Sequence, residues 1–377
     1  MRLAAAAGMM IAITITGTAM AGSAVGQAAQ IAGAPSSPAA LSGLSCRTLA
    51  DCVAVGATSP QMATGLVVER WNGKHWSRSA LPQPAGTTAV TAGGVACPAA
   101  RECVAVGSAY PRRGQQYAIA ERWNGSRWSV GRAATAGVSS ALYAIACPSA
   151  GNCYAVGEYT PKGSAGQNPL IEHWDGRSWH QEAVPVPGRS TFAYLADISC
   201  RTAAFCVAAG SSGTVAFVER WNGRRWIETT PPSAAGALLS GVACPAVTRC
   251  FAVGFGGAGN KSLVERWNGT TWSSSQTPGP AAGNSAGLQS ISCVSPVRCL
   301  AVGNHLGNGV YAVSCNGRGW HLVAVAPVGG KLGSFGAVRC LSATNCVALG
   351  ATTAFAATQR YESAFWNGRT WKIVATA

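Results

Sequence analysis

Short apolar runs, each ending in glycine, recur along the chain at intervals of about fifty residues. Each run directly follows a cysteine, and the seven runs are Val53–Gly56, Val104–Gly107, Tyr154–Gly157, Val207–Gly210, Phe251–Gly254, Leu300–Gly303 and Val347–Gly350. They are apolar at consecutive positions, which is typical of strands that are buried on both faces. The pattern predicts seven copies of one unit, each containing a fully covered strand.

A second motif, W-N-G-x-x-W, follows each run and first reads Trp71-Asn72-Gly73-Lys74-His75-Trp76. All thirteen tryptophans fall in this motif, and in the sixth unit Cys315 and Trp320 take the two places. Asn-Gly between apolar segments is a strong hairpin signal. Each unit is therefore expected to hold four strands, which we name a to d. Strand a ends at the first cysteine, b is the apolar run, c ends at the first tryptophan and d starts near the second.

Four short strands in a unit of about 49 residues, repeated around a ring, are the signature of a β-propeller. The fold class predicted is all-β, a seven-bladed β-propeller with four antiparallel strands per blade. The blades are expected to start near residues 43, 94, 144, 197, 241, 290 and 337.

Fourteen of the fifteen cysteines form C-x5-C pairs, and their first members are 44 to 53 residues apart. A disulfide across a short hairpin is expected in each blade. The pairs are Cys46/Cys52, Cys97/Cys103, Cys147/Cys153, Cys200/Cys206, Cys244/Cys250, Cys293/Cys299 and Cys340/Cys346. Metal binding is the alternative, but the five histidines do not recur with the cysteines, so neither a metal nor another cofactor is expected. Cys315 has no partner in the pattern and is expected to be a free thiol, buried or else reactive or intermolecular.

The order of apolar run, glycine, Glu-Arg-aromatic, turn, tryptophan and proline resembles a kelch repeat. Glu69-Arg70-Trp71-Asn72-Gly73, followed by Trp76 and Pro82, shows the likeness well. It covers about residues 43–377, with one glycine where kelch has two, tryptophan for the usual tyrosine, and the added cysteines. The turn between strands c and d is also similar to the Asp-box hairpin of sialidase-type propellers, without its Ser-x-Asp. The tryptophan pairs and the repeated glutamates are expected to be scaffold, with the Glu-Arg step bonding neighbouring blades.

The N-terminus differs from the rest of the chain. Arg2, the apolar segment Leu3–Met20 and the triplet Ala19-Met20-Ala21 predict a cleaved signal peptide over residues 1–21. A retained membrane anchor is the alternative. Residues 22–42 are predicted to be a flexible leader or a strand that closes the ring. The mature chain is expected to be secreted and extracellular, without a transmembrane segment, and monomeric.

The formal net charge is +15. Part of it lies at the predicted c–d turns, in Lys74, Arg127, Arg177, Arg224, Arg225, Arg318 and Arg369. Such a ring could hold the protein against an acidic surface, and ordinary solubility is the alternative. Nucleic acid is not expected as a partner, because the chain lacks interleaved basic and aromatic residues.

Loop lengths vary on one side of the predicted propeller only. From the strand-b glycine to the first aromatic of the c–d turn the count runs from 10 to 16, whereas the a–b and c–d turns keep their length. Binding residues are usually placed on variable loops that a rigid scaffold holds. The candidate ligand-binding residues are Tyr110, Arg112, Arg113, Gln115, Tyr159, Lys162, His305 and Tyr361.

No catalytic residues are assigned. Only Tyr110, Arg112, Arg113 and Glu158 approach the residue set of a sialidase. The sequence favours an extracellular recognition protein for an acidic polysaccharide or cell-envelope polymer. The alternatives are a secreted propeller enzyme acting on glycans, such as a sialidase-like hydrolase or a lyase, and a scaffold that binds an extracellular protein.

Overall fold

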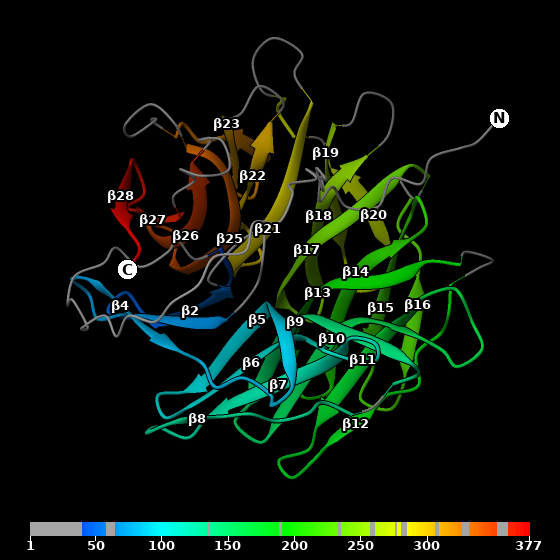
Figure 1. Ribbon diagram of the computed structural model, residues 1–377. Coiled ribbons are helices and arrows are strands. Elements are labelled where there is room, and N and C mark those ends of the chain that lie inside the picture. The colour runs from blue at the N-terminus through cyan, green and yellow to red at the C-terminus, as the bar shows by residue number, and fades with distance from the viewer. Residues whose placement is uncertain are drawn as a thin grey trace, which may run out of the picture. The chain divides into compact units, whose positions relative to one another are not determined.

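The computed structural model describes residues 40–57, 65–134, 136–187, 191–232, 235–256, 261–275, 277–279, 285–305, 309–325, 332–352 and 361–377 (Figure 1). The chain divides into two units, Met1–Ser36 and Ser37–Ala377, and all described residues belong to the second. The predicted signal peptide, residues 1–21, and residues 22–39 of the leader lie outside the described residues.

Seven four-stranded sheets form the second unit. The a strands are β1 (Ala40–Thr48), β5 (Thr87–Ala99), β9 (Ser139–Ser149), β13 (Ala193–Thr202), β17 (Ala237–Ala246), β21 (Ala286–Ser295) and β25 (Leu332–Ser342). The b strands are β2 (Asp51–Ala57), β6 (Glu102–Pro111), β10 (Asn152–Thr160), β14 (Phe205–Ser212), β18 (Arg249–Gly256), β22 (Arg298–His305) and β26 (Asn345–Thr352).

The c strands are β3 (Leu66–Trp71), β7 (Tyr117–Trp123), β11 (Asn168–Trp174), β15 (Val215–Trp221), β19 (Lys261–Trp267), β23 (Gly309–Cys315) and β27 (Tyr361–Trp366). The d strands are β4 (Trp76–Ala80), β8 (Trp128–Ser129), β12 (Trp179–Gln181), β16 (Trp226–Thr229), β20 (Trp272–Ser275), β24 (Trp320–Leu322) and β28 (Trp371–Ala375). Each sheet is antiparallel in the order a-b-c-d, and consecutive a strands contact one another in the middle of the ring (Figure 1). The predicted seven-bladed β-propeller is confirmed.

No helix among the described residues is long and apolar enough to cross a membrane.

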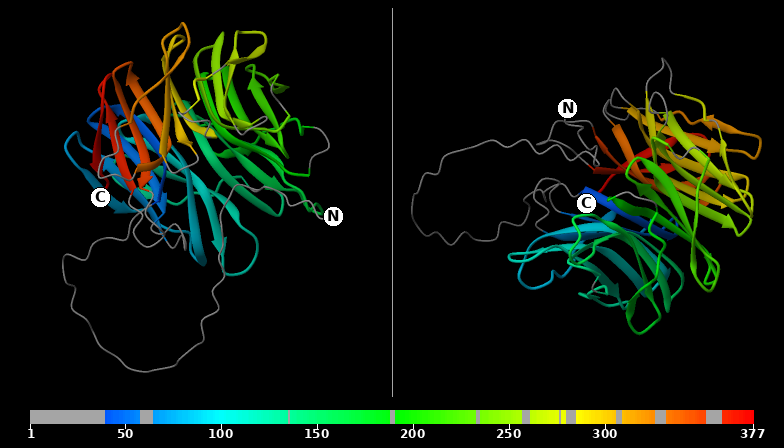
Figure 2. Two further views of the ribbon diagram at one scale, coloured as in Figure 1. Left: turned by 90° about the horizontal axis from the view of Figure 1, so that it is seen from above. Right: turned by 90° about the vertical axis from the view of Figure 1, so that its right-hand side faces the viewer.

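The b strands are buried on both faces because each blade is packed between two others (Figure 2). Val53 and Val55 of β2 point toward the second blade, whereas Ala54 packs with Val347 of the seventh. Both sets of side chains are almost completely buried. The continuous apolar run in each b strand therefore follows from its contacts with two neighbouring blades.

The repeated glycine in strand b is required by the strand beside it. At Gly107, Gly157 and Gly210, a Cβ atom would overlap a backbone carbonyl oxygen of the a strand of the same blade. The a strands are irregular at this level, with register shifts such as the one between Leu195 and Asp197. The glycine thus makes room for an irregularity that recurs around the ring.

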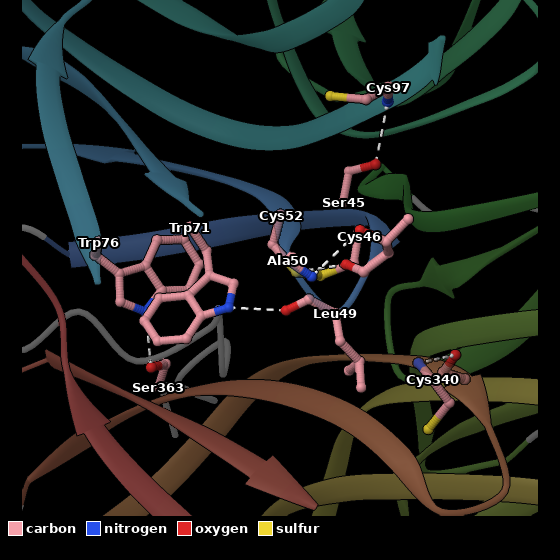
Figure 3. Close-up of a disulfide and its surroundings, with 12 residues drawn as sticks. Ser45, Cys46, Leu49, Ala50, Cys52, Trp71, Trp76, Cys97, Cys340 and Ser363 are labelled. Atoms are coloured by element: carbon pink, nitrogen blue, oxygen red, sulfur yellow. Dashed lines mark hydrogen bonds between the residues drawn. A yellow bond between two sulfur atoms is a disulfide. The ribbon is translucent and has the colours of Figure 1, made fainter. Parts of the chain in front are cut away.

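Each blade carries its predicted disulfide across the a–b hairpin, and the seven bonds are confirmed. Cys46 and Cys52 lie directly opposite each other, with Cα atoms 4.0 Å apart (Figure 3). The backbone amide of Cys97 in the next blade donates to the Ser45 hydroxyl over 3.1 Å. Seven disulfides indicate that the chain folds in an oxidising environment.

The second cysteine of each disulfide lies in the core and is not part of any accessible site. It is the second residue of its b strand, which neighbouring blades cover on both faces. The seven residues are Cys52, Cys103, Cys153, Cys206, Cys250, Cys299 and Cys346, and all of them are buried. Oxidised and enclosed in this way, their sulfur atoms are inaccessible to a ligand, and the alternative of metal binding by the C-x5-C pairs is wrong. These cysteines belong to the scaffold.

The tryptophans of each W-N-G-x-x-W motif are scaffold. Trp71 and Trp76 lie directly opposite each other, with ring centroids 5.6 Å apart, and both are buried. Four residues form the turn between them. The side-chain oxygen of Asn72 accepts the amides of Lys74 and His75, both over 3.0 Å.

The Glu-Arg step of the first blade links that blade to both of its neighbours. The carboxylate of Glu69 accepts the amide of Ala377 in the seventh blade over 3.0 Å. Arg70, the next residue, places its guanidinium 4.3 Å from the ring centroid of Trp123 in the second blade. Arg122 makes the same cation–π contact with Trp174 of the third blade, also at 4.3 Å. Glutamate and arginine therefore face opposite neighbours.

Two of these buried glutamates have no hydrogen-bond partner among the described residues. Glu172 accepts the amide of Ala134, which lies six residues after the second tryptophan of the preceding blade. In the blades before Glu121 and Glu219, the residues that correspond to Ala134 are Pro82 and Pro185, which have no amide hydrogen to donate. Burial raises the pKa of both carboxyl groups to about 8.

The ring closes by direct packing of the first blade against the seventh. The indole of Trp76 donates to the Ser363 hydroxyl over 2.9 Å (Figure 3). The ring of Trp71 packs on that of Phe365, with ring centroids 4.8 Å apart. Within the described residues, the seventh sheet contains only β25–β28, and Ala40–Ser42 belong to β1 of the first blade. Every blade is thus built from consecutive strands.

Replacing Gly157 with alanine is expected to lower the free energy of unfolding by about 1–3 kcal/mol, because the new methyl group displaces β9. Thermal or urea unfolding measures the change. The control is Gly151→Ala in an a–b turn, where the nearest atom lies 3.7 Å from the added carbon. Equal stability of the two variants would contradict the steric explanation.

The buried glutamates predict a pH-dependent stability. The pKa of Glu121 and Glu219 is higher in the folded chain than in the unfolded chain, so the folded state binds more protons between about pH 4.5 and pH 8. Stability is therefore lost as the pH rises through this window, by up to about 1.4 kcal/mol per pH unit for each group. Glu121→Gln and Glu219→Gln should flatten the dependence of Tm on pH. Glu102→Gln controls for the loss of a carboxylate, because Glu102 forms a surface ion pair with Arg122. If Tm depended on pH as steeply in Glu121→Gln and Glu219→Gln as in the parent, the buried glutamates would not be the source of the effect.

Candidate functional site

The antiparallel order of the strands gives the propeller two different faces. The a–b and c–d turns lie on one, the turn face, and the b–c and d–a connections lie on the other, the loop face. Every candidate ligand-binding residue predicted from the sequence lies in or beside a b–c connection on the loop face. Tyr110, Arg112, Arg113 and Gln115 belong to blade 2, Tyr159 and Lys162 to blade 3, His305 to blade 6 and Tyr361 to blade 7.

Two of the four blade 2 candidates, Tyr110 and Gln115, line a shallow groove on the loop face. Tyr110, Gln115 and Gln116 line it together with Ser139 of blade 3, and its volume is about 180 Å³. The loop is fixed from both sides, because the amide of Arg112 donates to the Gly86 carbonyl and that of Ser140 to the Gln116 carbonyl. Arg112 and Arg113 are exposed on the same loop but do not line the groove.

A group of tyrosines lies near this groove, across blades 2, 3 and 4. The Tyr143 hydroxyl of β9 is hydrogen-bonded to the carboxylate of Glu158 in β10. Gln167 donates to the same carboxylate over 2.6 Å. The ring of Tyr194 in β13 meets that of Tyr143 edge-on at 6.3 Å, and Tyr110 is close enough to influence the pKa of Tyr143. We call these five residues the tyrosine cluster.

Burial dominates the electrostatics of the tyrosine cluster. It raises the pKa of Glu158, and the hydrogen bond from Tyr143 opposes this effect. Burial, followed by the nearby Glu158 charge, raises the pKa of Tyr143. The pKa of Tyr194 is also raised by burial, while its hydrogen bond with Ser211 lowers it. Both phenols are therefore neutral hydroxyl groups at physiological pH, able to donate and accept hydrogen bonds.

Tyr143 and Tyr194 are not among the candidate residues predicted from the sequence, because both lie in a strands and not in loops. Tyr143 lies four residues before the first cysteine of its blade and lines the central channel. The other six blades carry Ser42, Gly93, Ala196, Ser240, Gln289 and Gly336 at this position. One large aromatic residue at a position where the other blades carry small or flexible residues is the sequence signal that could have revealed Tyr143.

The remaining candidates lie apart from the tyrosine cluster. Tyr159 follows Glu158 in β10, so its side chain lies on the opposite face of the strand. It packs against the core between blades 2 and 3. Lys162 is exposed in the following loop. The ring of His305 lies against Gly309 of its own hairpin. Tyr361 lies in blade 7, and burial raises the pKa of its hydroxyl.

Two further features bear on chemistry. No three His, Cys, Asp or Glu side chains within the described ranges come together as metal ligands. Cys315 is free and buried, opposite Cys299 in the sheet. Cys315 replaces the tryptophan that would lie beside Arg266 of blade 5. Arg266 therefore faces no indole, and it is more exposed than Arg70 or Arg220.

The fold matches solved propellers over almost the whole chain. The polysaccharide lyase PL25, an ulvan lyase, matches with a TM-score of 0.60 at 8% identity, covering 90% of this chain and 97% of that one. YCF48 bound to a D1 peptide matches with a TM-score of 0.56 at 14% identity, covering 91% and 93%. The Hadza microbial sialidase Hz136 matches with a TM-score of 0.50 at 8% identity, covering 90% and 66%. No family model and no curated protein sequence matches the chain. At these identities the likeness shows a shared propeller fold.

Tyr143→Phe is expected to alter the pH dependence of stability. Without the hydroxyl group, the carboxylate of Glu158 loses a hydrogen bond that lowers its pKa, so the folded-state pKa rises further. The variant should be less stable than the parent at neutral pH, and the gap should narrow as the pH falls through the raised folded-state pKa of Glu158, because the carboxyl group is then protonated in both proteins. Tm measured across the pH range tests this. Tyr110→Phe is the control, and equal pH profiles for all three proteins would contradict the role of the hydrogen bond.

Proposed function

We propose that the chain is an extracellular recognition protein that binds a carbohydrate or cell-envelope polymer at the tyrosine cluster and the adjoining groove. The observation that carries the proposal is the partly exposed tyrosine cluster, with 38% of Tyr110 and 37% of Tyr143 accessible, on the variable loop face. Sugar rings offer apolar C–H faces to aromatic side chains and hydroxyl groups to amides and phenols. Tyr110, Gln115, Gln116 and Ser139 supply both kinds of contact within one groove.

The proposal includes export. Seven disulfides require oxidising conditions, and residues 1–21 have the pattern of a signal peptide. The kelch-like interpretation of the repeat belongs to the same proposal, since it rests on the sequence motif. Among propellers of this fold, one is a polysaccharide lyase and another a sialidase, so the architecture is compatible with glycan ligands.

A second candidate function is catalysis on a glycan, as a hydrolase or a lyase. The hydrogen bond between Tyr143 and Glu158 favours it, because a phenol and a carboxyl group in hydrogen-bond contact can exchange a proton. The two functions differ in their products: a recognition protein releases its glycan unchanged, whereas an enzyme yields new reducing or unsaturated ends.

The test is binding of the purified protein to a panel of glycans and cell-wall polymers at low and high salt. We expect saturable binding to one class that persists at high salt. Tyr110→Ala should weaken it by about 1–3 kcal/mol, because it removes an aromatic stacking surface. Isothermal titration calorimetry on the best ligand provides the affinities.

Arg369→Gln is the matched control, since it removes an exposed residue on the turn face and should leave glycan affinity unchanged. Two results together would contradict specific recognition at the loop face. The protein would bind every anionic polymer with an affinity that high salt abolishes, and Tyr110→Ala and Arg369→Gln would lose affinity equally.

A further inference from the structure

The central channel is a second cavity, built from the a strands of all seven blades. Its volume is about 980 Å³. The lining runs from the level of Tyr143 to the residue after the first cysteine, as at Arg47 and Arg201. Since the a strands run from the loop face to the turn face, the cavity occupies the half of the channel next to the disulfides.

Three arginines line this cavity, and only one of them is neutralised. Arg47 forms an ion pair with Asp51 over 2.9 Å. Within the described residues, Arg201 and Arg339 have no carboxylate within ion-pair distance. They extend from blades 4 and 7, on different sides of the ring.

The one carboxylate in the lining does not offset these charges. Asp197 accepts the amides of Val242 and Ile198, both over 2.8 Å, and so links blade 4 to blade 5. Burial raises its pKa to about 7, which leaves it only partly ionised at neutral pH. Asp197 is thus engaged with the backbone of the ring.

Arg339 occupies a position at which three other blades carry a serine that bonds the next blade. The residue before the first cysteine is Ser45, Ser199 or Ser292 in three other blades, and each hydroxyl accepts the cysteine amide of the next blade. A guanidinium has no acceptor atom and cannot make this bond. Arg339 reaches water inside the channel but is surrounded by protein, and this burial lowers its pKa without neutralising it.

The surroundings of the channel reinforce the positive charge. Ten lysines and arginines lie in the a–b and c–d turns or at the strand ends next to them, against Asp51, Glu102 and Asp175. Charges of one sign around a low-dielectric cavity raise the local concentration of the opposite ion. An uncompensated cation in such a cavity is unfavourable, so a bound anion would stabilise the folded state.

We propose that this half of the channel binds an oxyanion of the phosphate or sulfate type through Arg201 and Arg339. The guanidinium groups of these two lining residues supply planar, charged donors that suit such oxygens. The anion is either a free ion or an ester group on a longer molecule. This site lies toward the turn face and does not depend on glycan recognition at the loop face.

The test titrates inorganic phosphate into the purified full chain at constant ionic strength, set with sodium chloride, and follows heat and Tm. We expect saturable binding and a rise in Tm. Arg201→Gln and Arg339→Gln should each weaken phosphate affinity by about tenfold. Arg318→Gln, an exposed turn-face residue of blade 6, should retain the parental affinity. If Arg339→Gln fails to fold, Arg201→Gln decides the outcome.

The proposal would be overturned if phosphate changed heat and Tm no more than chloride does. It would also be overturned if Arg318→Gln lost as much phosphate affinity as Arg201→Gln, because the effect would then belong to the charge of the whole turn face. Methyl phosphate separates the two sources of the anion. Binding as tight as that of inorganic phosphate supports an ester group on a longer molecule, whereas weaker binding supports a free ion.

Discussion

The packing of each blade between two others is the constraint on which the structure depends. It requires a b strand that is apolar on both faces, a glycine where the a strand is irregular, and side chains that bond across the gap. Glu69 faces the seventh blade and Arg70 the second, so one dipeptide connects three blades. Because the first and seventh blades pack in the same way, the ring closes without a shared strand among the described residues.

Most of this architecture could be predicted from the sequence, because each constraint recurs seven times. The cysteine spacing and the W-N-G-x-x-W motif correctly predicted seven blades, four strands in each and seven disulfides. The candidate ligand-binding residues do not recur, so only loop position pointed to them. That criterion selected Tyr110 and Gln115, which share a groove, but it also selected His305 and Tyr361 in distant blades. It overlooked Tyr143, because the aromatic residue occupies a scaffold strand.

The two faces present different chemistry for different physical reasons. Turns of fixed length carry most of the exposed cations, together with the disulfides that secure the a–b hairpins. The loop face carries Tyr110 at the end of β6 and the amides of Gln115 and Gln116 in the connection that follows. Their neutral hydrogen-bonding groups suit discrimination between similar ligands. Tyr143 belongs to both regions, since it lines the channel on one side and bonds Glu158 on the other. In this account the loop face confers specificity and the turn face attracts anions.

The central claim is that a glycan is recognised at the tyrosine cluster, and hydrogen–deuterium exchange of the protein with and without its saturating glycan tests it most directly. The account predicts slower exchange in three loop-face segments, residues 110–116, 139–143 and 158–167. Protection confined to the c–d turns, such as residues 72–75, would place the ligand on the opposite face and contradict the claim.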